Sequence, residues 1–133
     1  MKALIIVFGV LLLAVLISCE NEEPNCVCTT EFRTYLVTVI DTLGNPVDSL
    51  QTRVTNRRGK LSAFEGLSQP PYMDGAYYVM TDGYVNDFST NPEKIIFSGN
   101  KNNLDITAEF FFNTDECGCH VYKVSGPDTL ALR

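Results

Sequence analysis

The chain contains no tryptophan and one histidine, His120. Nucleophilic catalysis needs a base beside the nucleophile, and a lone histidine leaves little scope for that arrangement. In a strand, His120 would point away from its neighbour Cys119, so we interpret it as a surface or edge residue. We therefore expect no enzyme and no catalytic residues.

The lack of tryptophan also argues against a sugar-binding surface of stacked aromatic rings. The tyrosines that could replace it are Tyr72, Tyr77, Tyr78 and Tyr84. Adjacent strand residues face opposite sides of a sheet, so either Tyr77 or Tyr78 is predicted to lie in the core instead.

Basic residues are scarce: there are 10 Lys and Arg against 16 Asp and Glu, and the net charge is −6. Such a chain has no basic patch to neutralise phosphates, so we expect no nucleic-acid partner. The acidity also argues against electrostatic attraction to anionic lipid. The paired carboxylates Glu22-Glu23 and Asp115-Glu116 fall in tether or turn segments, where we expect them to be solvated.

No segment after residue 18 shows a long helical repeat of apolar residues. Short β-branched and aromatic runs separated by Gly, Pro, Asn and Asp turns predict strands instead. They cover residues 35–40, 50–55, 76–81, 94–97, 104–112, 119–124 and 129–132. This pattern predicts one all-β domain over residues 26–133, an immunoglobulin-like β-sandwich.

The clearest strand, 104–112, alternates apolar and polar residues. Glu109 lies on its polar face, and the apolar face is predicted to be core: Leu104, Ile106, Ala108, Phe110 and Phe112. Phe111 interrupts the polar face. We expect it to be covered by a neighbouring loop or terminus, or to be an exposed contact for a partner.

The first nineteen residues form a separate segment: Lys2, an apolar run from Ala3 to Ile17, then Ser18-Cys19. The run fits the apolar region of a signal helix and is short for a transmembrane helix, which needs about 20 residues. The ending Leu16-Ile17-Ser18-Cys19 resembles the lipobox of bacterial lipoproteins. The alternative is an ordinary secretory peptide that leaves Cys19 as a free thiol.

The lipobox resemblance implies cleavage of residues 1–18 and attachment of acyl chains such as palmitate to Cys19. Two or more chains hold a protein firmly in a bilayer. The mature chain then has 115 residues and, without Lys2, 9 basic against 16 acidic residues, a net charge of −7. This implies an outer-membrane protein of the cell envelope, anchored through lipid.

An acidic tether, residues 19–25, follows the anchor. Its carboxylates Glu20, Glu22 and Glu23 resemble the export signal of surface lipoproteins in some Gram-negative bacteria, or they form a plain solvated tether. The six residues from Glu20 to Asn25 span about 20 Å at ~3.3–3.6 Å each, so the domain would sit close to the membrane.

Four cysteines remain, in two Cys-x-Cys pairs: Cys26, Cys28, Cys117 and Cys119. In an exported protein such an even set predicts disulfides. Residues two apart in a strand lie ~6.5 Å apart at Cα, near the limit for a bridge, so bridges between the pairs are favoured. Antiparallel pairing gives Cys26–Cys119 and Cys28–Cys117, and parallel pairing gives Cys26–Cys117 and Cys28–Cys119.

A metal site is the alternative for these thiols, because four thiolates, with or without His120, would suit Cu(I) or Zn. Cys117-Gly118-Cys119-His120 is one residue short of a haem-attachment motif, so we expect no haem and no other cofactor.

The segment from Val37 to Val47 contains a strand and an acidic-x-x-Gly-x-Pro-Val turn. It resembles the opening of a carboxypeptidase-regulatory-like, or transthyretin-like, domain, and Gly75 to Val79 resembles the family's strand entered from Gly. The resemblance implies a transthyretin-like sandwich of a mostly non-catalytic kind. We therefore expect a non-enzymatic binding or structural module; the alternative is a metal-handling envelope protein.

Overall fold

The computed structural model describes residues 25–56, 70 and 73–133. The predicted signal peptide, Cys19, the predicted tether up to residue 24 and Tyr72 lie outside the described residues, and the predictions made for them stay predictions.

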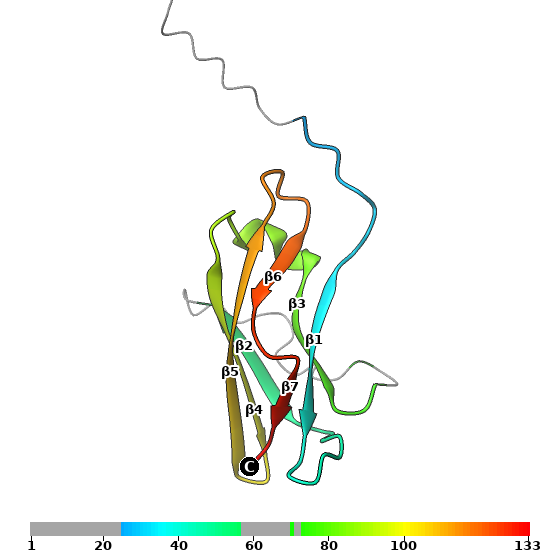
Figure 1. Cartoon of the computed structure of the whole chain (residues 1–133), viewed down its shortest axis with the longest axis vertical. Helices are drawn as coiled ribbons and strands as arrows, with labels where there is room; N and C mark the ends of the chain where they lie inside the picture. The colour runs from blue at the N-terminus through cyan, green and yellow to red at the C-terminus, as the bar shows by residue number, and fades with distance from the viewer. Residues whose placement is uncertain (1–24, 57–69, 71–72) are drawn as a thin grey trace, which may run out of the picture.

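The domain is all-β and consists of two sheets (Figure 1). A three-stranded sheet has the order β3-β1-β7, and a four-stranded sheet has the order β2-β4-β5-β6. The strands are β1 (Thr34–Ile40), β2 (Gln51–Asn56), β3 (Ala76–Thr81), β4 (Glu93–Lys101), β5 (Leu104–Thr114), β6 (Val121–Ser125) and β7 (Thr129–Ala131). All neighbours pair antiparallel except β1 and β7, which are parallel.

All seven predicted strands are present; β6 begins two residues later than predicted, at Val121, and there are two larger differences. β4 is longer than predicted because it pairs with β5 along its whole length, from Glu93 opposite Phe112 to Lys101 opposite Leu104. Asn102 and Asn103 close this hairpin with φ of 51° and 65°, a left-handed conformation that Asn tolerates. The other difference is a short 3-10 helix, η1 (Asp82–Asp87), where only a turn was expected.

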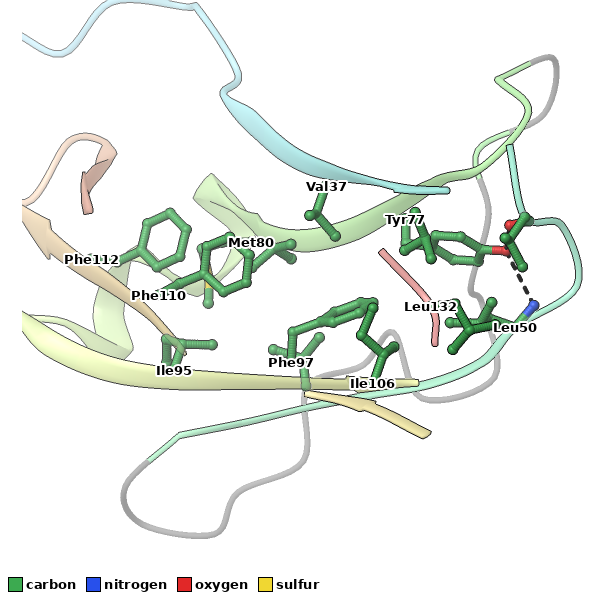
Figure 2. Packing of buried hydrophobic residues seen from close by; sticks show 14 of the residues in the cluster. Val37, Leu50, Tyr77, Met80, Ile95, Phe97, Ile106, Phe110, Phe112 and Leu132 are labelled. Carbon is green, nitrogen blue, oxygen red and sulfur yellow. Dashed lines mark hydrogen bonds between the residues drawn. The ribbon is translucent and has the colours of Figure 1, made fainter. Parts of the chain in front are cut away.

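The core lies between the two sheets and is rich in aromatic residues (Figure 2). Phe110 stacks near Phe112, their ring centroids being 6.3 Å apart, and Tyr35 meets Phe112 edge-on. Of the predicted apolar face of β5, Ile106, Phe110 and Phe112 are buried, Ala108 is half-buried, and Glu109 is exposed as expected. The core is therefore made by inward-facing residues from both sheets.

The prediction that Leu104 is core is wrong, because its side chain is 44% exposed. Leu104 is the first residue of β5, next to the two-residue turn and opposite Lys101. The alternation of the strand is correct there, but the tip of a hairpin has no facing layer to bury it.

Tyr77 is the tyrosine that enters the core, while Tyr78 is half-buried. The hydroxyl of Tyr77 donates to the Val47 carbonyl at 2.5 Å and accepts from the Leu50 N–H at 3.1 Å. This large buried ring therefore has its polar atom satisfied and fixes the segment that leads into β2, as Figure 2 shows.

The turn after β1 is formed by Asp41. Its carboxylate oxygen accepts from the N–H groups of Leu43 and Asn45, each at 2.8 Å, and these bonds, with that from the Asn45 side chain first among them, lower the pKa of Asp41. Gly44 has φ of 86°, a conformation that favours glycine. In this motif the acidic residue thus supplies the hydrogen bonds of the turn, and the glycine supplies its left-handed backbone conformation.

Candidate functional site at the disulfide end

Residues 25–32, which precede β1, form an arm outside the sheets, and all of them are exposed. Arg33, the next residue, is half-buried. Two disulfides join the arm to the loop between β5 and β6: Cys26–Cys117 and Cys28–Cys119, with Cα–Cα distances of 5.5 and 5.3 Å. Both bridges span 91 positions, so the pairing is the parallel one. The prediction that bridges form between the Cys-x-Cys pairs agrees with this arrangement.

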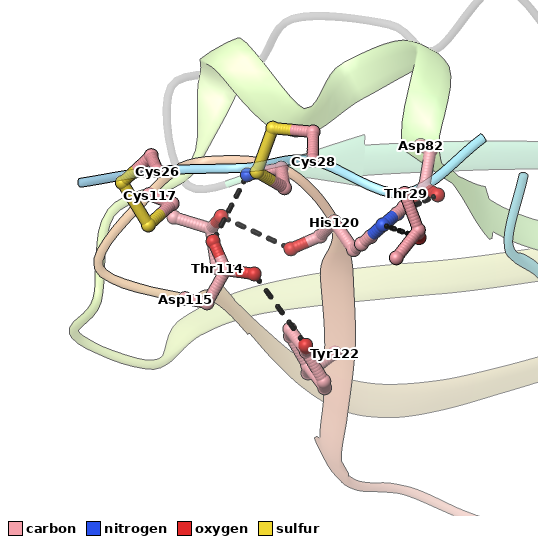
Figure 3. The surroundings of a disulfide bond; sticks show 10 residues. Cys26, Cys28, Thr29, Asp82, Thr114, Asp115, Cys117, His120 and Tyr122 are labelled. Carbon is pink, nitrogen blue, oxygen red and sulfur yellow. Dashed lines mark hydrogen bonds and ion pairs between the residues drawn. A yellow bond between two sulfur atoms is a disulfide. The ribbon is translucent and has the colours of Figure 1, made fainter. Parts of the chain in front are cut away.

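The β5–β6 loop presents its two cysteines through a tight turn (Figure 3). Gly118 has φ of 62°, and its N–H donates to the carbonyl of Asp115. The carboxylate of Asp115 accepts from the Cys119 N–H at 2.9 Å. Glu116 is exposed as expected, but Asp115 is half-buried and shapes the turn, so the expectation that it is merely solvated is wrong.

His120 is buried, with 5% of its surface exposed, and the prediction of a surface or edge residue is wrong. That prediction assumed a strand over residues 119–124, whereas β6 begins at Val121. The backbone before the strand turns the imidazole inward, where Nδ1 lies 2.7 Å from Asp82 Oδ2 and Nε2 lies 2.9 Å from Thr29 Oγ1. His120 therefore connects the arm to the interior of the sandwich.

Asp82, the first residue of η1, is the polar centre of this end. Its carboxylate accepts from the backbone N–H groups of Arg33 and Val121, both at 2.8 Å, and contacts His120. Burial opposes ionisation, but the hydrogen bonds from Arg33, His120 and Val121 together outweigh it and lower the pKa of Asp82. One carboxylate thus joins the start of β1, η1 and the start of β6.

No local pattern in the sequence indicates the role of Asp82. Its partners are 38 to 49 positions away, and locally it is an Asp-Gly dipeptide, which indicates only a turn.

Thr29, His120 and Asp82 follow the order of hydroxyl, imidazole and carboxylate that nucleophilic enzymes use. Here, however, both carboxylate oxygens also accept backbone N–H groups that join the two sheets. Every buried side-chain N or O of the described residues has a hydrogen-bond partner. The geometry accounts for these three residues as a structural link between the arm and the sandwich.

No set of three or more His, Cys, Asp or Glu side chains within residues 25–56, 70 and 73–133 is placed to hold a metal ion. The four cysteines that the metal alternative requires are consumed in the two bridges. Opening of both bridges would be required before they could act as ligands.

Phe111 is half-buried on the outer face of the four-stranded sheet. It lies opposite Lys94 on β4, and Ile96, two positions on, is 36% exposed on the same face. On β6, Tyr122 is 38% exposed opposite Asn113, and the Arg33 guanidinium lies 4.4 Å from its ring centroid. Ile96, Phe111 and Tyr122 thus form an apolar row on the outer face of β4, β5 and β6, hereafter the outer row.

No helix in the described part of the chain is long and apolar enough to cross a membrane. Comparison with protein-family models, with curated proteins and with solved structures gives no match to this chain.

Proposed function

We propose that this chain is a lipid-anchored lipoprotein of the bacterial envelope that acts as a non-enzymatic binding or structural module. The observation that carries the proposal is the pair of disulfides at Cys26 and Cys28, a few residues after the predicted anchor. Stable disulfides form in oxidising compartments outside the cytosol, in keeping with an exported chain. The apolar run and lipobox-like ending at Cys19 supply the route of export and the lipid.

The bridges also define where the tether ends. Because Cys26 is bonded to the β5–β6 loop, only Glu20 to Asn25 separate the lipidated Cys19 from the domain. At ~3.3–3.6 Å per residue this permits about 20 Å, so the module works next to the outer membrane. The acidic residues Glu20, Glu22 and Glu23 favour the cell-surface side.

The fold type that we propose is a transthyretin-like variant of the immunoglobulin-like sandwich. It is supported by the turn at Asp41 and Gly44 and by the entry into β3 from Gly75, whose φ is 69°. A Cβ on Gly75 would come within 2.9 Å of the Val39 carbonyl oxygen, so this position requires glycine.

The outer row is the surface that we assign to partner binding. An aromatic residue partly exposed among polar neighbours can anchor a protein interface. Phe111 would supply that anchor, and the ion pair between Lys94 and Glu109, 2.8 Å apart, lies beside it.

The anchor is tested by Cys19→Ser, followed by partition between detergent and aqueous phases. The wild type should enter the detergent phase, and the variant should remain unprocessed or become aqueous. The double variant Cys26→Ser/Cys117→Ser is the matched control, because it removes cysteines without touching the lipid site and should still enter the detergent phase. Identical partition of the wild type and Cys19→Ser would refute the anchor.

The membrane face and the function class need separate measurements. Changing Glu20, Glu22 and Glu23 to Ala should reduce digestion by protease added to intact cells; unchanged digestion would make them a plain tether. Cross-linking in membranes should capture a partner that Phe111→Ala loses and Glu109→Ala retains. Stoichiometric Cu or Zn with free thiols after purification without reductant would favour the metal-handling alternative.

A further inference from the structure

The arm of residues 25–32, called the strap below, is attached to the domain by very few contacts. Apart from the two disulfides, its bonds to the described rest of the domain are the one between Thr29 and His120 and an exposed ion pair from Glu31 to Arg33, 3.4 Å apart. The first backbone hydrogen bonds in the chain order begin at Arg33, with its N–H and carbonyl both bonded to Asp82. The strap is therefore held by side chains alone.

The strap contributes nothing to the hydrophobic core. All buried members of the core cluster lie at Val37 or beyond, and the earliest residue packed against it is Tyr35. Val27 and Phe32 in the strap are 86% and 65% exposed. Because the sandwich is complete without the strap, detaching the strap removes no core contact.

The two bridges are accessible and mutually redundant. Cys26, Cys28 and Cys117 are exposed and Cys119 is half-buried, so a thiolate can approach them from solvent. Once one bridge is closed, the other closes only the few residues between them, and either one keeps the strap in place. Release therefore requires that both bridges open.

We propose that the strap is a redox-controlled extension of the tether, opened by a dithiol reductant. A thiolate of the dithiol attacks one sulfur of a bridge, forming a mixed disulfide and freeing the other cysteine as a thiolate. The second thiol of the reductant then resolves the mixed disulfide, so the reductant becomes a disulfide and the bridge becomes two thiols. Two electrons and two protons pass to each bridge, and two dithiols open both.

Opening both bridges lengthens the chain between anchor and sandwich. The proposed tether lengthens from Glu20–Asn25 to residues 20–32, which raises its maximum reach from about 20 Å to about 45 Å at ~3.3–3.6 Å per residue. The length change rests on the proposed lipid anchor at Cys19, whereas the release of the strap does not. The same release uncovers Nε2 of His120, which Thr29 contacts in the closed state.

His120 makes the release measurable because it is the only histidine. The protein is purified from bacterial cells without reductant and treated with diethyl pyrocarbonate, before and after full reduction by dithiothreitol. Acylation of His120 is followed by peptide mass spectrometry, and near-ultraviolet circular dichroism of the tyrosines monitors the fold. The rate should rise about tenfold or more on reduction, since a buried imidazole reacts mainly through local opening, and the tyrosine signal should persist.

Variants separate the bridges from the hydrogen bond. Cys26→Ser/Cys117→Ser and Cys28→Ser/Cys119→Ser should each keep His120 slow, and the variant lacking all four cysteines should be fast without reductant. Thr29→Val, which removes only the hydrogen bond, should stay slow. The proposal is overturned if full reduction leaves His120 slow, if reduction unfolds the sandwich, or if Thr29→Val alone matches the reduced rate.

The tether extension is measured on a supported bilayer by neutron reflectometry. Reduction should widen the layer between the bilayer and the domain, up to about 25 Å at full extension. A protein that does not bind the bilayer would refute the lipid anchor while leaving the His120 result intact. A bound protein whose layer does not widen, although His120 becomes reactive, would refute the tether extension.

Discussion

In the core, Phe110 and Phe112 are enclosed by apolar residues of both sheets, so their burial depends on many neighbours together. At the disulfide end, a few discrete links act between segments that are far apart in the sequence: two bridges and the bonds of Asp82 and His120. Burial in the core is spread over many residues, so the stability lost in a core variant depends on the side-chain volume that is removed. The links at the disulfide end are few and redundant, so their loss depends on which ones are removed together.

The largest effect should come from removing both bridges. Replacing all four cysteines by Ser should lower the free energy of unfolding by about 4–5 kcal/mol, because a loop of 91 positions is no longer closed in the unfolded chain. Removing either matched pair alone should cost about 2 kcal/mol or less, since the other bridge still closes that loop. Urea unfolding measures all three variants; a large loss from one matched pair would contradict the redundancy.

A loss of stability of similar size is expected from a single substitution in the core. Phe110→Ala should cost about 3–5 kcal/mol, because a fully buried ring leaves a cavity. Phe111→Ala, the adjacent ring on the outer face, is the matched control and should cost clearly less. A cost below about 1 kcal/mol for Phe110→Ala would mean that this face of β5 is not core.

A smaller effect is expected at Asp82. Asp82→Asn should cost about 1–3 kcal/mol near neutral pH, because a buried charged acceptor of three hydrogen bonds is lost. Asp105→Asn, at an exposed carboxylate, is the control and should change stability by less than about 0.5 kcal/mol.

The stabilisation by Asp82 should depend on pH in a defined direction. The folded pKa of Asp82 is lowered, so its carboxylate stabilises the fold above the unfolded pKa, ~3.9, and this contribution is lost as the pH falls through the lower folded value. The stability difference between the wild type and Asp82→Asn should therefore be full above about pH 4 and shrink below it. A difference that grows on acidification would contradict this account.

The core was predictable from the sequence because a strand's two-residue period places alternate side chains on one face wherever a facing layer exists. Ile106, Phe110 and Phe112 follow that rule, and Leu104 departs from it because the hairpin tip has no facing layer. The alternation within a strand predicts which side chains share a face, but it does not predict where the opposite sheet ends.

At the disulfide end, only the formation of bridges between the two Cys-x-Cys pairs was predictable from the sequence. Covalent geometry favours bridges between the pairs, but both pairings satisfy it, and the choice depends on the direction in which the strap meets the loop. The burial of His120 and the links of Asp82 arise from tertiary contacts over 38 or more positions, which no local pattern carries.

The most direct test of the account is peptide mapping of the unreduced protein by mass spectrometry. The account predicts two bridged species, one joining Cys26 to Cys117 and one joining Cys28 to Cys119, with no free thiol among these four residues. A protease cut between residues 26 and 28, or between 117 and 119, is needed to assign the partners, and partial reduction with stepwise alkylation gives the same information. Four free thiols, or bridges joining Cys26 to Cys119 and Cys28 to Cys117, would contradict it.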